Sequence, residues 1–192
     1  MERIGKITDP TDKWAIDGTI LHHKNDMYFV WSGWEGDENI AQNIYIAKMK
    51  SPTELSGERV LISRPEYDWE KIGGNGLKDG APFINEGPYA FCEEGRIFVA
   101  YSASGSWCTD YCIALLELVG DDPLDASSWT KHPTPVISKN EKFMGMGHCS
   151  IIEDEKMIFF HAWRADETNV VWNTVYPICA KYSLVGDRLI IE

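Results

Sequence analysis

Short runs of β-branched and aromatic residues recur along the chain, each bounded by Gly, Pro, Asn or Asp. Apolar residues at the 3.6-residue period of an amphipathic helix are hard to find, whereas each run has the length of a β-strand. The clearest runs are Met27–Ser32, Asn43–Met49, Arg59–Ser63, Arg96–Ala103, Tyr111–Leu118, Met157–Trp163, Ile178–Leu184 and Arg188–Ile191. The pattern predicts an all-β protein.

The runs repeat as three similar units, which open at Asp17, Glu86 and His148. The units span about residues 14–63, 83–138 and 145–192. A repeated four-stranded antiparallel unit is typical of a β-propeller blade, whose first strand lies next to the central axis. The three ionisable openers are therefore expected to converge near that axis, as in an acid–base site. The alternative is that Asp-Gly and Glu-Gly simply form turns.

Three blades are too few to close a propeller, which has about four to eight. We therefore expect a single partial propeller domain, in which residues 1–13 are the remnant of a preceding blade or a linker. The first and third blades would each expose an apolar face. A missing N-terminal chain or a homo-oligomer is expected to cover these faces.

Acidic residues outnumber basic ones, with 30 Asp and Glu against 18 Lys and Arg. The formal net charge of −12 argues against nucleic-acid partners and against anionic membranes, because both are bound through basic side chains. No run approaches the roughly 18 apolar residues of a membrane span, and the first residues lack the apolar segment of a signal peptide. We expect a cytoplasmic chain as given, whereas a longer protein could be extracellular.

Aromatic residues make up 12% of the chain and include eight Trp and eight Tyr. Such residues suit sugar handling, because their faces stack on the C–H faces of sugar rings while carboxylates bind hydroxyl groups. An all-β protein also uses aromatic residues for packing. Composition leaves both uses open.

Several segments make the sequence resemble glycoside hydrolase family 43, in particular its exo-acting α-L-arabinofuranosidases. These segments are WAIDGTIL, YFVWSGWEGDENIAQNIYIAKM, SGERVLISRPEYDWEK, INEGPYAF, VAYSASGSWCTDYCIALLEL, DPLDASSWTKHPTPV and MGHCSI. The resemblance implies a five-bladed propeller, of which this chain has the last three blades. It also implies hydrolysis with inversion at the anomeric carbon and no required cofactor.

The resemblance implies distinct roles for two carboxyl groups. Glu86, in INEGP, takes the place of the general acid, and Asp17, in WAIDGT, that of the neighbour that raises the pKa of the acid and orients it. In inverting glycosidases a further carboxylate, about 6.5–9.5 Å from the acid, activates water. That general base lies on the first blade of full-length relatives, outside this sequence. Asp9, in ITDPTD, is not assigned as the base, because it precedes the Asp17 strand at linker spacing.

The resemblance also extends to the floor and walls of the site. His148, in GMGHCS, takes the place of an axial histidine that faces a structural calcium ion or a water cluster. Calcium prefers oxygen ligands, so His148 would act through a bound water; the alternative is a core histidine. Aromatic and amide side chains are expected to contact substrate, with packing between blades as the alternative for each Trp: Trp14, Trp34, Trp107, Gln42 and Asn43.

The expected function is removal of terminal α-L-arabinofuranosyl residues from arabinan or arabinoxylan oligosaccharides, and a xylose-containing substrate is a second possibility. Without its general base the isolated chain is expected to lose most activity. The alternative is a non-catalytic carbohydrate-binding propeller or an inactive fragment. The absent base favours this alternative, whereas the joint presence of Asp17 and Glu86 argues against it.

Overall fold

A computed structural model describes residues 5–186 and 188–191 of the chain. Its strands form three antiparallel sets of four, in which each strand pairs with the next along the chain. The sets are β1 (Ala15–His23), β2 (Asp26–Gly33), β3 (Ala41–Ser51) and β4 (Glu54–Ser63); β5 (Phe83–Glu93), β6 (Arg96–Ala103), β7 (Cys112–Leu118) and β8 (Trp129–Lys131); and β9 (Phe143–Ile152), β10 (Met157–Arg164), β11 (Tyr176–Val185) and β12 (Arg188–Ile191). The all-β prediction is confirmed.

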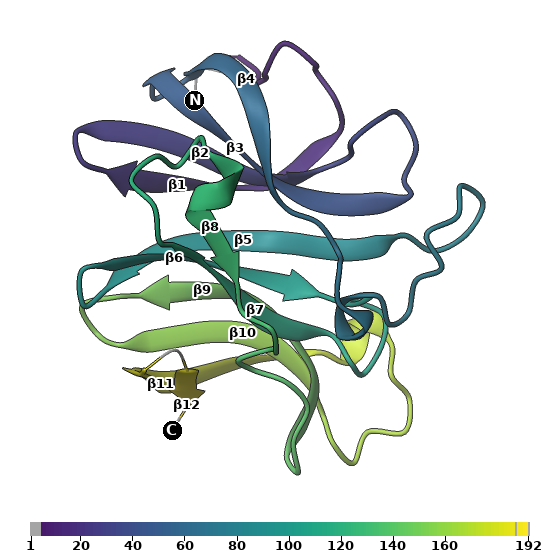
Figure 1. Ribbon diagram of the computed structural model, residues 1–192. Helices are drawn as coiled ribbons and strands as arrows, with labels where there is room; N and C mark the ends of the chain where they lie inside the picture. The colour runs from purple at the N-terminus through teal and green to yellow at the C-terminus, as the bar shows by residue number, and fades with distance from the viewer. Residues whose placement is uncertain (1–4, 187, 192) are drawn as a thin grey trace.

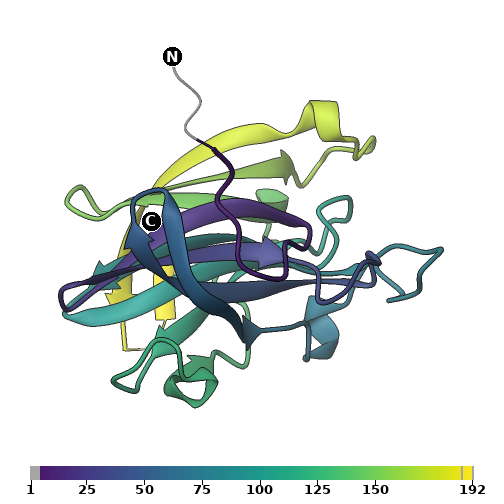
Figure 2. The same ribbon diagram turned by 90° about the horizontal axis from the view of Figure 1, so that it is seen from above.

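The three sets are stacked one on another, from β1–β4 at the top of Figure 1 to β9–β12 at the bottom. Their first strands are neighbours, because β1 packs against β5 and β5 against β9. The view from above shows that the sets are turned relative to one another and do not form one flat layer (Figure 2). This is the arrangement of part of a β-propeller, and we call the three sets the first, second and third blade.

Strand β7 shows why the blades stack. Successive side chains of a strand point to opposite faces, and both sets are apolar here. Leu116 packs with the first blade, whereas Ile113 and Leu115 pack with the third. A strand that is buried on both faces reads as an uninterrupted apolar run, as residues 112–116 do.

The closing strand of the second blade differs from the predicted one. The repeat pattern predicts that the run TPVIS, residues 134–138, closes the second unit. In the structure β8 occupies that edge, and Ile137 makes only a single bridge, to Ile113. The side chain of Asp125 caps a short 3-10 turn, η2 (Ala126–Ser128), that delivers Trp129 to the edge of β7. The two prolines of the PTPV segment lack the N–H groups that a strand ladder needs.

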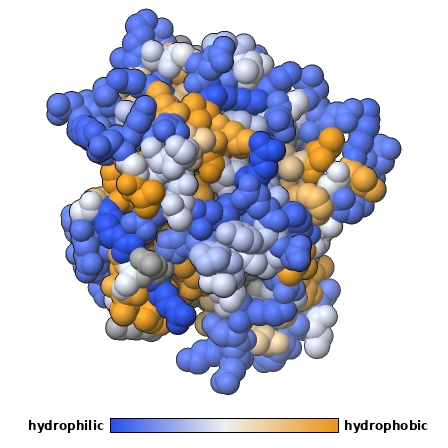
Figure 3. Space-filling model, viewed as in Figure 1, coloured by the Kyte–Doolittle hydropathy of each residue, from blue (hydrophilic) through white to orange (hydrophobic). Residues whose placement is uncertain are grey.

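The two outer faces of the stack are covered differently. Phe29 and Trp31 of the first blade line a hollow whose opposite wall is the segment that precedes β1. On the third blade Ile152 and Phe159 are exposed. Figure 3 shows apolar areas among the hydrophilic ones on the face seen in Figure 1. No helix among the described residues is long and apolar enough to cross a lipid bilayer.

Candidate active site

Each innermost strand contains a bulge near its start, where the pairing register shifts. The residue at the bulge has a left-handed backbone, with φ of 57° at Asp17, 55° at Gly87 and 55° at His148. These three residues therefore occupy equivalent positions in the three blades. Glu86 stands one residue before the bulge, so the predicted openers are not strictly equivalent.

The bulges bring the three strands together at one end of the stack. The Gly87 N–H donates to Asp17 Oδ2 at 3.2 Å, and His148 Nε2 lies 3.9 Å from Asp17 Oδ1. A Cβ atom on Gly87 would lie 3.3 Å from the His148 ring, so glycine lets the imidazole approach the backbone. Asp17 and His148 are thus neighbours of the strand that carries Glu86.

Glu86 is buried, with 9% of its surface exposed, and its Oε1 accepts a hydrogen bond of 2.9 Å from the Tyr111 hydroxyl. Burial raises the pKa of Glu86 because it disfavours the charged form, and the negative charge of Asp17 raises this pKa further. The hydrogen bond from Tyr111 and the charge of His148 partly oppose this rise. Glu86 therefore keeps its proton to a higher pH than an exposed glutamate does.

Tyr111 is a site residue that the sequence reasoning missed. Its ring is fully buried beneath Gly147, where a Cβ atom would lie 2.0 Å from the ring. Burial and the nearby Glu86 hold the pKa of Tyr111 well above its usual range, so the hydroxyl remains a donor. Beside it, the His148 N–H donates to Ser102 Oγ at 2.7 Å. In the sequence Tyr111 merely begins an apolar run, which is no signal of a site.

A second feature missed in the sequence is a buried polar network behind Glu86. The side chain of Asn85 donates to Glu70 Oε1 at 3.0 Å, and its own Oδ1 accepts from Ser63 Oγ at 2.7 Å. Glu70 is fully buried and pairs with the Lys131 ammonium at 2.9 Å. Asn85, the residue before Glu86, is therefore hydrogen-bonded both to the first blade, at Ser63, and to the loop before β5, at Glu70.

The predicted aromatic contacts lie in loops at the end of the stack where β1 and β5 begin. Trp14 and Trp34 stack with ring centroids 4.7 Å apart, and 37% of Trp14 is exposed. Trp107 is 47% exposed, and its indole N–H donates to the Gly73 carbonyl at 2.9 Å. Trp14 and Trp107 both present surface to solvent.

The predicted amide contacts are buried. Gln42 pairs in parallel register with Ile84, two residues before Glu86, and its Oε1 has no hydrogen-bond partner among the described residues. Asn43 donates to the Tyr45 hydroxyl at 3.4 Å. Gln42 is thus the amide adjacent to the strand that carries Glu86.

The residues present do not form a metal-binding set. Among residues 5–186 and 188–191 no group of three His, Cys, Asp or Glu side chains is arranged to hold a metal ion. The carboxylate near His148 is that of Asp17, at 3.9 Å. The calcium ion near the propeller axis stays a prediction, with His148 acting through a bound water.

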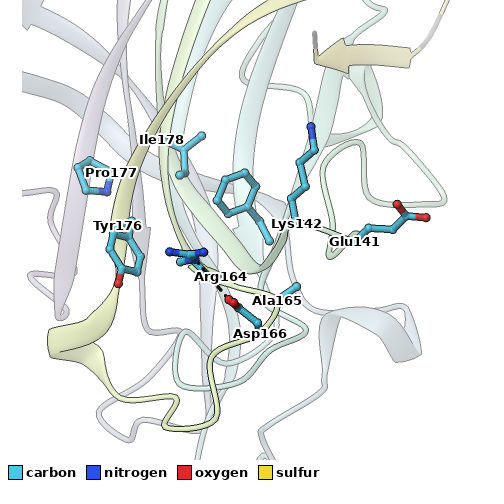
Figure 4. Close-up of a pocket in the computed structure, with 9 residues that line it drawn as sticks. Glu141, Lys142, Arg164, Ala165, Asp166, Tyr176, Pro177 and Ile178 are labelled. Atoms are coloured by element: carbon cyan, nitrogen blue, oxygen red, sulfur yellow. Dashed lines mark ion pairs between the residues drawn. The ribbon is translucent and has the colours of Figure 1, made fainter.

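An open hollow of ≈ 640 Å³ lies at the end of the third blade where β9 begins, beside the loop between β10 and β11 (Figure 4). Lys142, Arg164, Asp166 and Tyr176 are among its lining residues, and Arg164 Nε pairs with Asp166 Oδ1 at 3.3 Å. Neither Asp17 nor Glu86 lines this hollow.

Comparison with known proteins identifies the family. The model of glycosyl hydrolases family 43 matches residues 2–176, so the chain belongs to this family. It is 33% identical over 170 residues to an extracellular exo-α-(1→5)-L-arabinofuranosidase of Streptomyces chartreusis, covering 84% of this chain and 48% of the relative. It is 32% identical over 138 residues to α-L-arabinofuranosidase 43 of Humicola insolens, covering 71% and 27%.

Solved structures agree with this assignment. The chain superimposes on an α-L-arabinofuranosidase from Lactobacillus brevis with a TM-score of 0.80 and 30% identity, covering 96% of this chain and 57% of that one. A thermostable family-43 glycoside hydrolase gives a TM-score of 0.73 at 23% identity, which supports the fold. The chain spans about half the length of the curated relative from Streptomyces chartreusis.

Proposed function

We propose that this chain supplies the general-acid half of a glycoside hydrolase that removes terminal α-L-arabinofuranosyl residues from oligosaccharides. The observation that carries the proposal is Glu86, a buried carboxyl group with a raised pKa beside a second carboxylate. A general acid must hold its proton near the working pH and release it to the departing oxygen. The names of the similar enzymes support the arabinofuranosyl substrate.

In this mechanism the proton of Glu86 passes to the glycosidic oxygen as the bond between that oxygen and the anomeric carbon breaks. Asp17 favours the protonated form of the acid before the reaction, since two adjacent carboxylates resist carrying two charges. Tyr111 fixes the Glu86 carboxyl group through its hydrogen bond at 2.9 Å. A water molecule attacks from the opposite side of the sugar, which inverts the anomeric carbon.

The general base that activates this water comes from a part of the propeller outside these 192 residues. Asp9 does not supply it, because its carboxylate oxygens accept from the Thr11 hydroxyl at 2.9 Å and one of them lies 3.8 Å from Arg59 Nε, on the outer side of the first blade. A missing N-terminal chain would carry the base, whereas a second copy of this chain would only cover the exposed faces of the first and third blades. The extracellular names of the Streptomyces relatives favour action outside the cell.

The other predicted residues have supporting roles in this proposal. Trp14 and Trp107 offer exposed aromatic surface to sugar rings, and Trp34 supports Trp14 from behind. The unpartnered oxygen of Gln42 is suited to a sugar hydroxyl group. His148 closes the axial end of the site through bound water.

The proposal is tested with two substrates that differ in leaving group. In a propeller completed by the remaining blades, Glu86→Gln is expected to slow cleavage of arabinobiose by about 10²–10⁴-fold, because a sugar alkoxide needs a proton in order to leave. The same variant is expected to lose less activity on an aryl arabinofuranoside, whose phenolate leaves without one. Released arabinose and phenolate measure the two rates.

The matched control is Glu94→Gln, an exposed glutamate in the turn after β5, which is expected to match the unmodified chain. Equal losses on both substrates would contradict the role of Glu86 as the acid. A folded chain that binds arabino-oligosaccharide but never turns it over, even with the remaining blades added, would favour the carbohydrate-binding alternative.

A further inference from the structure

We propose that Trp172 contacts the sugar unit next to the terminal arabinofuranosyl residue, and so makes the site prefer oligosaccharides to single sugars. This inference rests on the proposed function and adds a residue to the same site. Trp172 begins η3 (Trp172–Thr174), a short 3-10 turn in the loop between β10 and β11.

Trp172 is exposed but held in place. Its surface is 60% exposed, although the residue before the turn, Val171, is tied to strand β10. The buried Trp163 donates its indole N–H to the Val171 carbonyl at 3.0 Å, and the Thr174 hydroxyl donates to the same carbonyl at 2.9 Å. A fixed aromatic surface loses little conformational entropy on binding, which favours a ligand contact.

A continuous series of ring contacts leads from Trp172 to the candidate acid. Trp172 and His161 meet edge to face, with ring centroids 5.0 Å apart at 78°. His161 in turn stacks on Tyr111 at 5.5 Å and 13°, and the Tyr111 hydroxyl donates to Glu86. Trp172 is therefore the outer end of an aromatic wall whose inner end touches the acid.

His161 keeps this wall uncharged. Burial lowers the pKa of His161 to about 4, so its ring is neutral at neutral pH. Both of its ring nitrogens are buried and have no hydrogen-bond partner among the described residues. An uncharged aromatic wall suits the C–H face of a sugar better than it suits an ionic ligand.

The depth of each residue decides which sugar it meets. Asp17 and Glu86 lie on the innermost strands, next to the propeller axis, whereas Trp172 lies in the loop after the second strand of its blade. An enzyme that cleaves terminal units holds the terminal sugar deepest. The next sugar then lies farther from the axis, beside Trp172.

The test measures binding of α-(1→5)-linked arabinobiose and of L-arabinose by calorimetry, with Glu86→Gln as the parent so that no substrate is consumed. Adding Trp172→Ala is expected to weaken arabinobiose binding about three- to tenfold and to leave L-arabinose unchanged. Trp172→Phe retains a ring and is expected to restore most of the affinity. Phe159→Ala, an exposed aromatic of the same blade, is the matched control and is expected to have no effect.

Tryptophan fluorescence gives a second readout, because arabinobiose is expected to shift the parent emission to shorter wavelength and to cause a smaller shift in Trp172→Phe, in which Trp14 and Trp107 are the proposed tryptophan contacts that remain. Equal arabinobiose affinity in the parent and in Trp172→Ala, or equal losses for both sugars, would overturn the role of Trp172. If the chain completed by the remaining blades still hydrolyses arabinosides in that case, the proposed function stands. If it neither binds nor hydrolyses them, both proposals fall.

Discussion

Two buried glutamates have opposite surroundings: Glu70, in the loop before β5, and Glu86, in β5. Glu70 accepts hydrogen bonds from two backbone N–H groups, from Asn85 and from the Tyr101 hydroxyl, and it pairs with Lys131. Glu86 accepts one hydrogen bond, from Tyr111, and lies near the like charge of Asp17.

The donors and charges around a buried carboxyl group decide whether it has a structural or a reactive role. Several donors and a nearby cation surround the carboxyl group of Glu70, so this residue ties together the elements that touch it. Burial and the like charge of Asp17 raise the pKa of Glu86, and its donor Tyr111 only partly opposes this rise. Asn85 links the two, because it donates to Glu70 and precedes Glu86 in β5.

The largest effect that this comparison predicts is on folding. Glu70→Gln should lower the free energy of unfolding by about 3–5 kcal/mol, because the Lys131 ammonium is left without its counter-charge. The amide nitrogen also cannot accept from the donors that now surround both oxygens. Urea unfolding of the two proteins measures the loss.

The matched variant is Glu86→Gln, which should change the free energy of unfolding by less than about 1 kcal/mol near pH 5, since an amide can still accept from Tyr111. If Glu70→Gln does not fold at all, Tyr101→Phe removes one donor only and should cost about 0.5–1.5 kcal/mol. Equal losses at Glu70 and Glu86 would contradict the comparison.

A smaller effect is expected in the pH dependence of stability. The native pKa of Glu86 is raised, so the native state keeps a proton that the unfolded chain loses above its ordinary glutamate value of about 4.3. The stability from this group is complete below that pH and is lost as pH rises through the native pKa. Glu86→Gln does not titrate, so it should gain stability relative to the unmodified chain between pH 4 and 8. If the free energies of unfolding of the two proteins, measured in urea, changed with pH in the same way across this range, the raised pKa would be contradicted.

Much of the fold followed from local patterns. The short runs of β-branched and aromatic residues, and the turn residues that bound them, predicted the strands, because both depend on neighbours in the chain. The closing strand of the second blade was misplaced, because a capped turn at Asp125 selects its register. Nothing in the run TPVIS itself reveals that turn.

The site was less accessible from the sequence. Asp17 and Glu86 were singled out because they stand at the openings of repeated units and in family-like motifs. Tyr111, Glu70 and His161 were missed, because each acts through contacts with residues 15 or more positions away in the chain. The need for Gly147 beside Tyr111 likewise becomes visible only when the blades are stacked.

The smallest expected effect is on the pKa of Glu86, which Asp17 and Tyr111 shift in opposite directions. Asp17→Asn removes a like charge and should lower the pKa of Glu86, whereas Tyr111→Phe removes a donor to the charged form and should raise it. Carbon-13 NMR of labelled glutamate carboxyl groups follows this titration, and Glu86→Gln identifies the signal. Burial is the main cause of the raised pKa, so both variants should still titrate above an exposed glutamate. A shift in the same direction in both variants would mean that the charge of Asp17 and the hydroxyl of Tyr111 do not act on Glu86 in opposite senses.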